Sequence, residues 1–343
     1  MKKLLNTLYI TSPEKYLALD GENVVIKENG AESSRIPFHN IESIVTMGNA
    51  GVSPALLGKC AEKNILVTFL SRSGRYLATA VGPYNGNVVL RQSQYRVADN
   101  EEKRLEIAKN MITGKLYNSR WVIERATRDY ANSLDVEKLK TVSLQIKKTV
   151  EDSQSCTDTQ KLRGMEGEAA ARYFSVFDDL ILQQKTDFQF LGRVKRPPTD
   201  YVNAMLSFSY TLLCSMMTTA LYCVGLDPYV GFMHTIRPGR ASLSLDLMEE
   251  FRSVFADRFV ISLINKRVIN KDDFFVKENE AVYFTDEGKR KFIQHWQTRK
   301  QSTIIHPFLK EKVQWGMTPY VQALLLSRYL RGDLDGYPPF LWK

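Results

Sequence analysis

The sequence predicts an α+β fold, with a β-rich N-terminal domain containing one helix over residues 1–95 and an all-α C-terminal domain over residues 96–343. Two patterns indicate this division. Up to about residue 80, short apolar runs alternate with turn residues, which is typical of strands. Beyond residue 87, apolar residues recur at helical spacing. A chain of 343 residues is long enough to bury both cores.

In the N-terminal domain, turn dipeptides such as Asp20-Gly21 separate the predicted strands. The predicted strands cover Leu4 to Ile10, Tyr16 to Leu19, Asn23 to Lys27, Ser34 to Pro37, Ile41 to Met47, Ile65 to Leu70 and Arg75 to Ala80. One helix should interrupt them, with Ser53 as its cap and Pro54 at its first position.

In the C-terminal domain, helices are expected at about 100–131 and 135–150, followed by a helix that contains Glu166. From Tyr201 to Leu226 no charged residue occurs, and this run is long enough to raise the question of a membrane span. Polar residues within it, such as Asn203, favour instead the central helix of a helical domain.

Composition restricts the class of protein. Hydrophobic residues make up 44% of the chain and charged residues 25%, as in an ordinary globular protein. The net charge of +9 favours a polyanionic partner, with nucleic acid ahead of a membrane surface because the basic residues form no amphipathic helix. The four cysteines show no CxxC spacing, and the N-terminal apolar run is too short for a signal peptide. We therefore expect a cytoplasmic protein.

The stretch HTIRPGRASLSLDLMEEF, residues 234–251, carries the densest candidate chemistry. Ser242 or Ser244 should cap a helix on which Asp246 stands one turn from Glu249 or Glu250. Two like charges at that spacing cost free energy unless a cation relieves them. The alternative is a solvated acidic face.

The histidine of this stretch lies in a loop interrupted by proline and glycine. His234 precedes the acids by 12 residues, with Arg237 and Arg240 between them. An imidazole beside carboxylates suits Mg²⁺ or Mn²⁺, while the lack of a nearby cysteine or second histidine argues against structural zinc. The arginines suggest that a phosphate group approaches this metal.

A second candidate acid is Glu166, which has glycines at 164 and 167. Glycine in a helix interior costs about 1 kcal/mol relative to alanine, so its presence suggests that something bulky comes close. Equally, Gly164 and Gly167 could mark a frayed helix start, where an acid is favoured by the helix dipole.

A third candidate is the basic loop of Arg193, Lys195 and Arg196, which precedes a helix that Thr199 or Asp200 should cap. Basic residues ahead of a helix N-terminus suit phosphate contacts, because the backbone N–H groups and the dipole add to the side chains. A surface loop with incidental charge is the alternative.

Taken together, these motifs resemble the CRISPR-associated integrases, endonucleases of the spacer-adaptation complex. The resemblance is carried by the β-rich N-terminal domain, GMEGEAAARYF around Glu166, RPPTDYVNA at 196–204, RPGR after His234, and Asp246 with Glu249. It covers essentially the whole chain, and the order and spacing of the motifs make it specific.

The resemblance implies a metal-dependent enzyme of antiviral defence that inserts new spacers into a CRISPR array, by attack of a 3′-hydroxyl on a phosphodiester. The implied ligands of Mg²⁺ or Mn²⁺ are Glu166, His234, Asp246 and Glu249. Many members carry aspartate at the last position, so Glu250 is the alternative to Glu249. The candidates for contact with DNA phosphates are Arg193, Lys195, Arg196, Arg237 and Arg240.

The resemblance also implies partners. Members form an asymmetric homodimer through the β-rich domain, here residues 1–95, and assemble with a small ferredoxin-like protein on double-stranded DNA. An accessory nuclease that trims the donor is a further candidate partner, and no membrane is involved. Two other functions remain open, a free-standing metal-dependent nuclease of branched DNA and a non-enzymatic DNA-binding scaffold.

Overall fold

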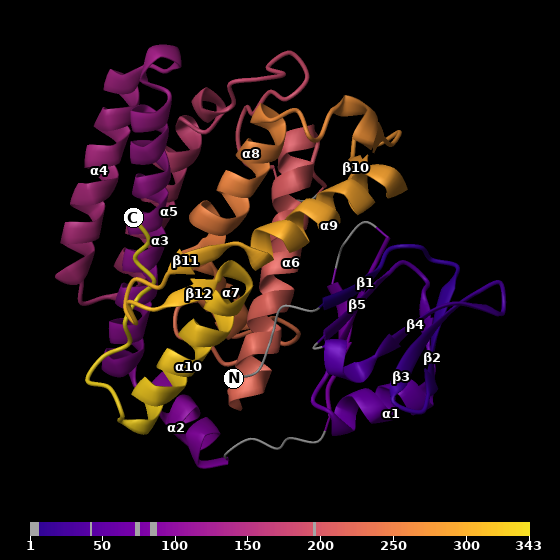
Figure 1. Ribbon diagram of the computed structural model, residues 1–343. Coiled ribbons are helices and arrows are strands. Elements are labelled where there is room, and N and C mark those ends of the chain that lie inside the picture. The colour runs from indigo at the N-terminus through magenta and orange to yellow at the C-terminus, as the bar shows by residue number, and fades with distance from the viewer. Residues whose placement is uncertain (1–6, 42, 73–75, 83–87, 195–196) are drawn as a thin grey trace.

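The computed structural model describes residues 7–41, 43–72, 76–82, 88–194 and 197–343. Figure 1 shows two regions, with the N-terminal strands gathered on one side and the helices forming the rest of the molecule. The predicted α+β fold, with its β-rich N-terminal part and helical C-terminal part, is therefore confirmed.

The N-terminal region contains two four-stranded sheets. The first has the order β1-β5-β7-β8, formed by β1 (Thr7–Ile10), β5 (Ser43–Met47), β7 (Leu66–Leu70) and β8 (Tyr76–Ala80). The second has the order β4-β3-β2-β6, formed by β4 (Ala31–Pro37), β3 (Asn23–Glu28), β2 (Lys15–Asp20) and β6 (Gly51–Val52). The helix α1 (Pro54–Glu62) is capped as predicted, because Ser53 Oγ accepts a hydrogen bond of 3.2 Å from Leu56 N.

The helical region holds the larger of the two hydrophobic cores. Its main helices are α2 (Val88–Asp99), α3 (Glu101–Asp129), α4 (Val136–Gln154), α5 (Thr159–Ser175), α6 (Tyr201–Val224), α7 (Ser242–Phe251), α8 (Arg258–Asn265), α9 (Asp286–Gln301) and α10 (Thr318–Arg331). Two small hairpins lie among them, β9 (Phe274–Val276) with β10 (Val282–Phe284), and β11 (Thr303–Ile305) with β12 (Lys312–Gln314). A π-helical segment over Arg252–Asp257 joins α7 to α8.

The predicted helices at 100–131 and 135–150 correspond to α3 and α4. The change from strand to helix comes earlier than residue 95, since α2 begins at Val88 and packs against α3 and α10. Residues 88–95 therefore pack with the helical region, whereas the domain boundary itself stays a prediction.

Helix α6 runs through the middle of the helical region in Figure 1, and it packs against α7 and α10. Asp200 caps it, with Oδ1 accepting a 2.7 Å hydrogen bond from Asn203 N, and Gly225 ends it at a φ of +83°. By length and composition this helix could span a membrane, but 67% of its most apolar window is buried inside the chain. Such burial is typical of the core helix of a helical domain.

The predicted cap of α7 is wrong. Ala241 occupies the cap position, and no side chain there bonds the helix N-terminus. The two serine hydroxyls are used elsewhere, because Ser242 Oγ donates to Thr235 O at 3.3 Å and Ser244 Oγ shares a 2.8 Å hydrogen bond with Thr218 Oγ1. These contacts tie the start of α7 to the preceding loop and to α6.

Candidate functional site

Two carboxylates from different helices meet at one ammonium group. Lys115 on α3 forms a hydrogen-bonded ion pair with Glu166 Oε1 on α5, and its Nζ lies 2.7 Å from Glu249 Oε2 on α7. The side chain of Glu249 is only 4% exposed and that of Glu166 is 21% exposed. The packing of α5 and α7 against α3 therefore brings together two acids that are far apart in the sequence.

The other oxygen of Glu249 is paired as well. Arg252 donates a 2.7 Å hydrogen bond to Oε1, and its guanidinium lies 4.3 Å above the ring of Tyr210. Burial alone would raise the pKa of Glu249, but the charges of Arg252 and Lys115 outweigh it and hold that pKa well below its usual range. Glu249 is therefore a charged carboxylate in a closed site.

Glu249 Oε2 is buried and is held by a cation. Its partner among the described residues is the ammonium of Lys115, which lies 2.7 Å away and forms an ion pair with it. A buried carboxylate oxygen is stable beside a donor or a cation, so this position suits a metal ion as well as an ammonium.

His234 is held by Asp246. Asp246 Oδ1 lies 2.6 Å from His234 Nδ1 and accepts a 2.8 Å hydrogen bond from His234 N. Oδ2 accepts hydrogen bonds from Phe232 N at 2.6 Å and Met233 N at 2.9 Å. Because a carboxylate can only accept, Nδ1 donates to it, and Nε2 of the imidazole then carries the lone pair that a metal requires.

Two further residues shape the loop that carries His234. Arg163 on α5 donates from Nε to Met233 O at 2.9 Å, which fixes the backbone directly before the histidine. Gly231 allows the loop to approach α7, because a Cβ at that position would lie 2.5 Å from Asp246 Oδ2. The orientation of the imidazole is therefore set by both α5 and α7.

Glu250 is separated from these groups. Its carboxylate accepts hydrogen bonds from Tyr337 Oη at 2.5 Å, Phe340 N at 2.6 Å and Gln322 Nε2 at 3.1 Å. Burial raises the pKa of Glu250 to about 8, despite these donors. A Cβ at Gly114 would lie 2.9 Å from Glu250 Cγ, so α3 can pass only because glycine stands there. This geometry favours Glu249 over Glu250 as a ligand.

The predicted ligands thus form two pairs, Glu166 with Glu249 and His234 with Asp246. Within the described part of the chain, no three His, Cys, Asp or Glu side chains are placed so that they could share one ion. The convergence of all four predicted ligands on one metal therefore stays a prediction.

The candidate DNA-binding residues differ in their surroundings. Arg193 is turned inward, where it donates to Asn203 Oδ1 at 2.6 Å and burial lowers its pKa. Lys195 and Arg196 lie outside the described residues. Arg237 is exposed and Arg240 is partly exposed, so these two are the described candidates that face solvent.

Of the two explanations for the glycines beside Glu166, the frayed helix start is wrong, and the close approach of a bulky group stays a prediction. The two glycines lie inside α5, which begins at Thr159. A Cβ at Gly164 or Gly167 would meet nothing within 4 Å, so no neighbouring segment of the described chain requires glycine there. The surface beside Glu166 is open to an incoming group.

Sequence reasoning missed Lys115 and Arg252. Lys115 lies among buried residues of α3, including Ile112 and Leu116, and a lysine on such a face is almost never buried unless it is paired. The sequence therefore indicates that Lys115 is paired with an acid. It does not indicate which acids pair with Lys115, because that depends on the packing of three helices.

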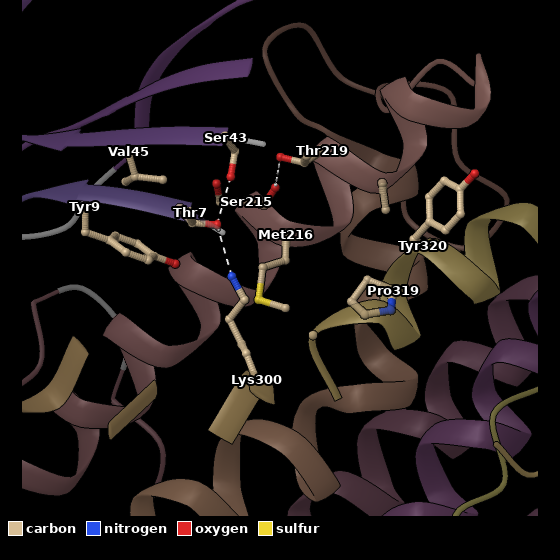
Figure 2. A pocket seen from close by; sticks show the side chains of 12 residues that line it. Thr7, Tyr9, Ser43, Val45, Ser215, Met216, Thr219, Lys300, Pro319 and Tyr320 are labelled. Atoms are coloured by element: carbon tan, nitrogen blue, oxygen red, sulfur yellow. Dashed lines mark hydrogen bonds between the residues drawn. The ribbon is translucent and has the colours of Figure 1, made fainter. Parts of the chain in front are cut away.

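Two hollows lie elsewhere, and none of the predicted ligands lines either of them. Figure 2 shows the first, where the β1 and β5 edge meets α6, α9 and α10. There Lys300 Nζ donates to Thr7 Oγ1 at 3.0 Å, and the cavity of about 20 Å³ has room for about one water. The second, of about 590 Å³, is lined in part by the acids Asp187, Asp200 and Glu280, which do not suit phosphate.

The sequence matches the family described as CRISPR associated protein Cas1 over residues 8–298. The chain belongs to the Cas1 family. Among its relatives, the CRISPR-associated endonuclease Cas1 1 of Chlorobaculum tepidum is 46% identical over 343 residues, which cover 100% of both chains. The resemblance predicted from the motifs is therefore confirmed.

Solved structures with the same fold agree with membership of the Cas1 family. A casposase bound to an integration product has a TM-score of 0.84 and 25% identity, covering 98% of this chain and 93% of the casposase. A chain of a Cas6-RT-Cas1–Cas2 complex also has a TM-score of 0.84, at 22% identity, covering 100% of this chain and 36% of that one. At that identity the second likeness shows the fold alone.

The donor set fits a hard divalent cation. Carboxylate oxygens from Glu166 and Glu249 and one imidazole nitrogen suit Mg²⁺ or Mn²⁺, which accept oxygen ligands and retain water. Oε2 of Glu249, which faces the ammonium of Lys115, and Nε2 of His234 are the atoms that such an ion would use.

Proposed function

We propose that this chain is a metal-dependent DNA integrase and endonuclease of CRISPR adaptation, which joins DNA strands by attack of a 3′-hydroxyl on a phosphodiester. The observation that carries the proposal is the meeting of Glu166 and Glu249 at a single ammonium. A cation position with two carboxylates around it, beside an oriented imidazole, is the arrangement that a catalytic divalent ion requires.

In this proposal Glu166, His234 and Glu249 hold the ion, and their side chains shift to share it, since no three acids or histidines of the described residues stand within reach of one ion as they are. Asp246 positions His234 instead of binding metal directly, because its two oxygens already accept four hydrogen bonds. This assignment differs from the sequence-based prediction, which placed Asp246 among the ligands. Arg252 supports Glu249 from the opposite side.

When bound, Mg²⁺ or Mn²⁺ would activate the 3′-hydroxyl and stabilise charge on the attacked phosphate. Asp246 accepts the Nδ1–H of His234, so the imidazole presents Nε2 to the ion, and a nitrogen that binds the ion does not act as a general base. One P–O bond forms while another breaks, so the exchange needs no nucleotide cofactor. The attacking 3′-hydroxyl gives its proton to solvent and the expelled 3′-oxygen takes one up, so one alcohol is consumed and one is released.

The substrate is proposed to be double-stranded DNA. The net charge of +9, the exposed Arg237 and the open surface of α5 at Gly164 and Gly167 support an approach of the phosphate backbone to Glu166. The casposase, a structural neighbour, is bound to an integration product. We further propose a homodimer that works with the small ferredoxin-like partner and, for trimming the donor, an accessory nuclease.

One assay tests this function. A linear donor duplex and a supercoiled plasmid carrying a repeat are incubated with the protein, with Mn²⁺ or with a chelator. We expect joined product only with Mn²⁺. Cut strands without joined product would instead identify a free-standing nuclease, and DNA binding without any strand chemistry would identify a scaffold.

The matched variants are His234→Ala and His295→Ala. The first should abolish strand joining while DNA binding survives, because it removes a metal ligand and leaves the basic surface unchanged. The second removes a histidine of α9 that is no part of the site, and should join strands at the wild-type rate. Equal loss of joining and binding in His234→Ala would show a structural histidine.

A further inference from the structure

We propose that Lys115 is a resident counter-cation of the metal site, which holds the carboxylates of Glu166 and Glu249 together before metal binds and which the divalent ion displaces. This inference rests on the proposed function. It adds a step to it, because metal loading becomes an exchange of one cation for another.

The first argument is burial. The side chain of Lys115 is 11% exposed and that of Glu249 is 4% exposed. Charged groups this deeply buried are found almost only in pairs, since removal of one partner leaves an uncompensated charge away from water. Without an ammonium or a metal at this point, Glu249 would face Glu166 with only Arg252 to offset two negative charges.

The second argument is position. Arg252 contacts Oε1 of Glu249 alone, and its guanidinium is fixed against the ring of Tyr210. Lys115 contacts Glu166 as well as Oε2 of Glu249, and so lies between the two carboxylates. The ammonium group of Lys115 ends a flexible four-carbon chain, so it can move away from the carboxylates more easily than a guanidinium stacked on a ring. Of the two cations, Lys115 is the one that occupies the place of a bridging ion.

The third argument is charge. The carboxylates of Glu166 and Glu249 and the cations of Lys115 and Arg252 cancel, so this cluster of four is neutral as it stands. A divalent ion added beside Lys115 would bring two more positive charges to carboxylates that are already paired, which is unfavourable in a partly closed site of low dielectric constant. The ion therefore binds by taking the carboxylate oxygens that the ammonium releases, and the apparent affinity for metal is lower than the ligands alone would give.

The test measures thermal stability and Mn²⁺ binding of the full chain, for wild type and Lys115→Met. In EDTA, Lys115→Met should melt several degrees below wild type, because Glu249 loses a buried partner. In a Mn²⁺ titration it should bind about tenfold more tightly, since a competing contact worth about 1.4 kcal/mol is removed. If Lys115 were purely structural, Lys115→Met would lower both the melting temperature and the affinity for Mn²⁺.

Two other variants complete the design. Lys109→Met is the matched control, because Lys109 lies on the same helix and donates to Gln154 O at 2.9 Å, so Mn²⁺ affinity should equal that of wild type. Lys115→Arg keeps the positive charge, and it should bind Mn²⁺ more weakly than wild type because a guanidinium pairs with carboxylates through several N–H groups.

The outcomes separate this inference from the proposed function. If wild type binds Mn²⁺ and Lys115→Met binds it no more tightly, the inference is overturned while the metal enzyme stands. Mn²⁺ binding by Lys115→Arg as tight as that of wild type would also overturn it. If wild type binds no Mn²⁺, the proposed function and the inference both fail.

Discussion

The two faces of α7 show how neighbouring acids in one helix can have pKa values shifted in opposite directions. Glu249 and Glu250 are both almost fully buried, at 4% and 0% exposure. Glu249 faces two cations and has a pKa well below its usual range, whereas Glu250 faces neutral donors and burial raises its pKa to about 8. Burial therefore does not decide the charge of a carboxylate; the charge of its partners does.

The difference also separates two tasks. The face of α7 with Glu249 keeps a negative charge available for a cation. The face with Glu250 binds the C-terminal tail, through the backbone of Phe340 and the hydroxyl of Tyr337, and so fixes the position of the helix. We infer that the tail acts on the site only by holding α7 in place.

The largest expected effect comes from replacing one carboxyl group of α7 at a time by an amide. Glu249→Gln should reduce strand joining by more than the roughly 100-fold that loss of an outer-shell partner typically costs, since it weakens a ligand itself. Glu250→Gln, the matched control, should join strands within about threefold of wild type, because the tail contacts survive. Rates of joining with Mn²⁺ measure both. Equal losses in the two variants would contradict the separation of tasks.

The second effect is on stability. Glu250→Ala should lower the free energy of unfolding by about 3 kcal/mol, because it leaves a cavity and removes the acceptor for Phe340 N and Tyr337 Oη. Glu250→Gln should lose about 1 kcal/mol, since an amide keeps the volume and can bond at both positions. Urea denaturation in EDTA gives the values. If the two variants lost the same free energy, packing and hydrogen bonds would not be what Glu250 contributes.

The fold was largely predictable because its signals are local. Periodicity and capping residues gave α3, α4 and the Ser53 cap of α1 within a few residues. The cap of α7 failed because Ser244 bonds Thr218 on another helix, and such a tertiary partner leaves no mark in the local pattern. The sequence likewise predicts a solvent-facing basic residue at Arg193, yet its guanidinium is turned toward α6.

The site was predictable in residue type but not in arrangement. Helical spacing placed Asp246 one turn from either Glu249 or Glu250. Only the tail, about 90 residues later, shows that Glu250 is the one whose carboxyl group is already hydrogen-bonded elsewhere. The ammonium of Lys115 comes from a helix that is even more distant in sequence than the tail. Contacts between distant segments follow from packing, which a single sequence does not specify.

The third prediction concerns pH. The folded pKa of Glu250 lies near 8, above its ordinary 4.5, so the folded protein keeps a proton that the unfolded chain loses. Stability from this group is present below pH 4.5 and is lost as pH rises to about 8. The lowered pKa of Glu249 acts in the opposite sense and only below pH 4.5, so it does not interfere in this range.

Thermal melts of wild type and Glu250→Gln between pH 5 and pH 8 measure this effect. The wild-type Tm should fall more steeply with pH than that of the variant. Asp257, whose pKa burial raises to about 6, contributes to both proteins and cancels in the comparison. Parallel curves would mean that Glu250 is ionised throughout, as Glu249 is.

The smallest effect tests one donor. Tyr337 Oη donates to Glu250 Oε1 at 2.5 Å and accepts from Gln322 Nε2 at 2.8 Å. Tyr337→Phe should lower the free energy of unfolding by about 1 kcal/mol and leave strand joining unchanged, because the ring still fills its place. In a Glu250→Gln background the same change should cost less, since the two residues interact directly. Additive losses would show that the hydroxyl stabilises the tail through Gln322 and not through the carboxyl group of α7.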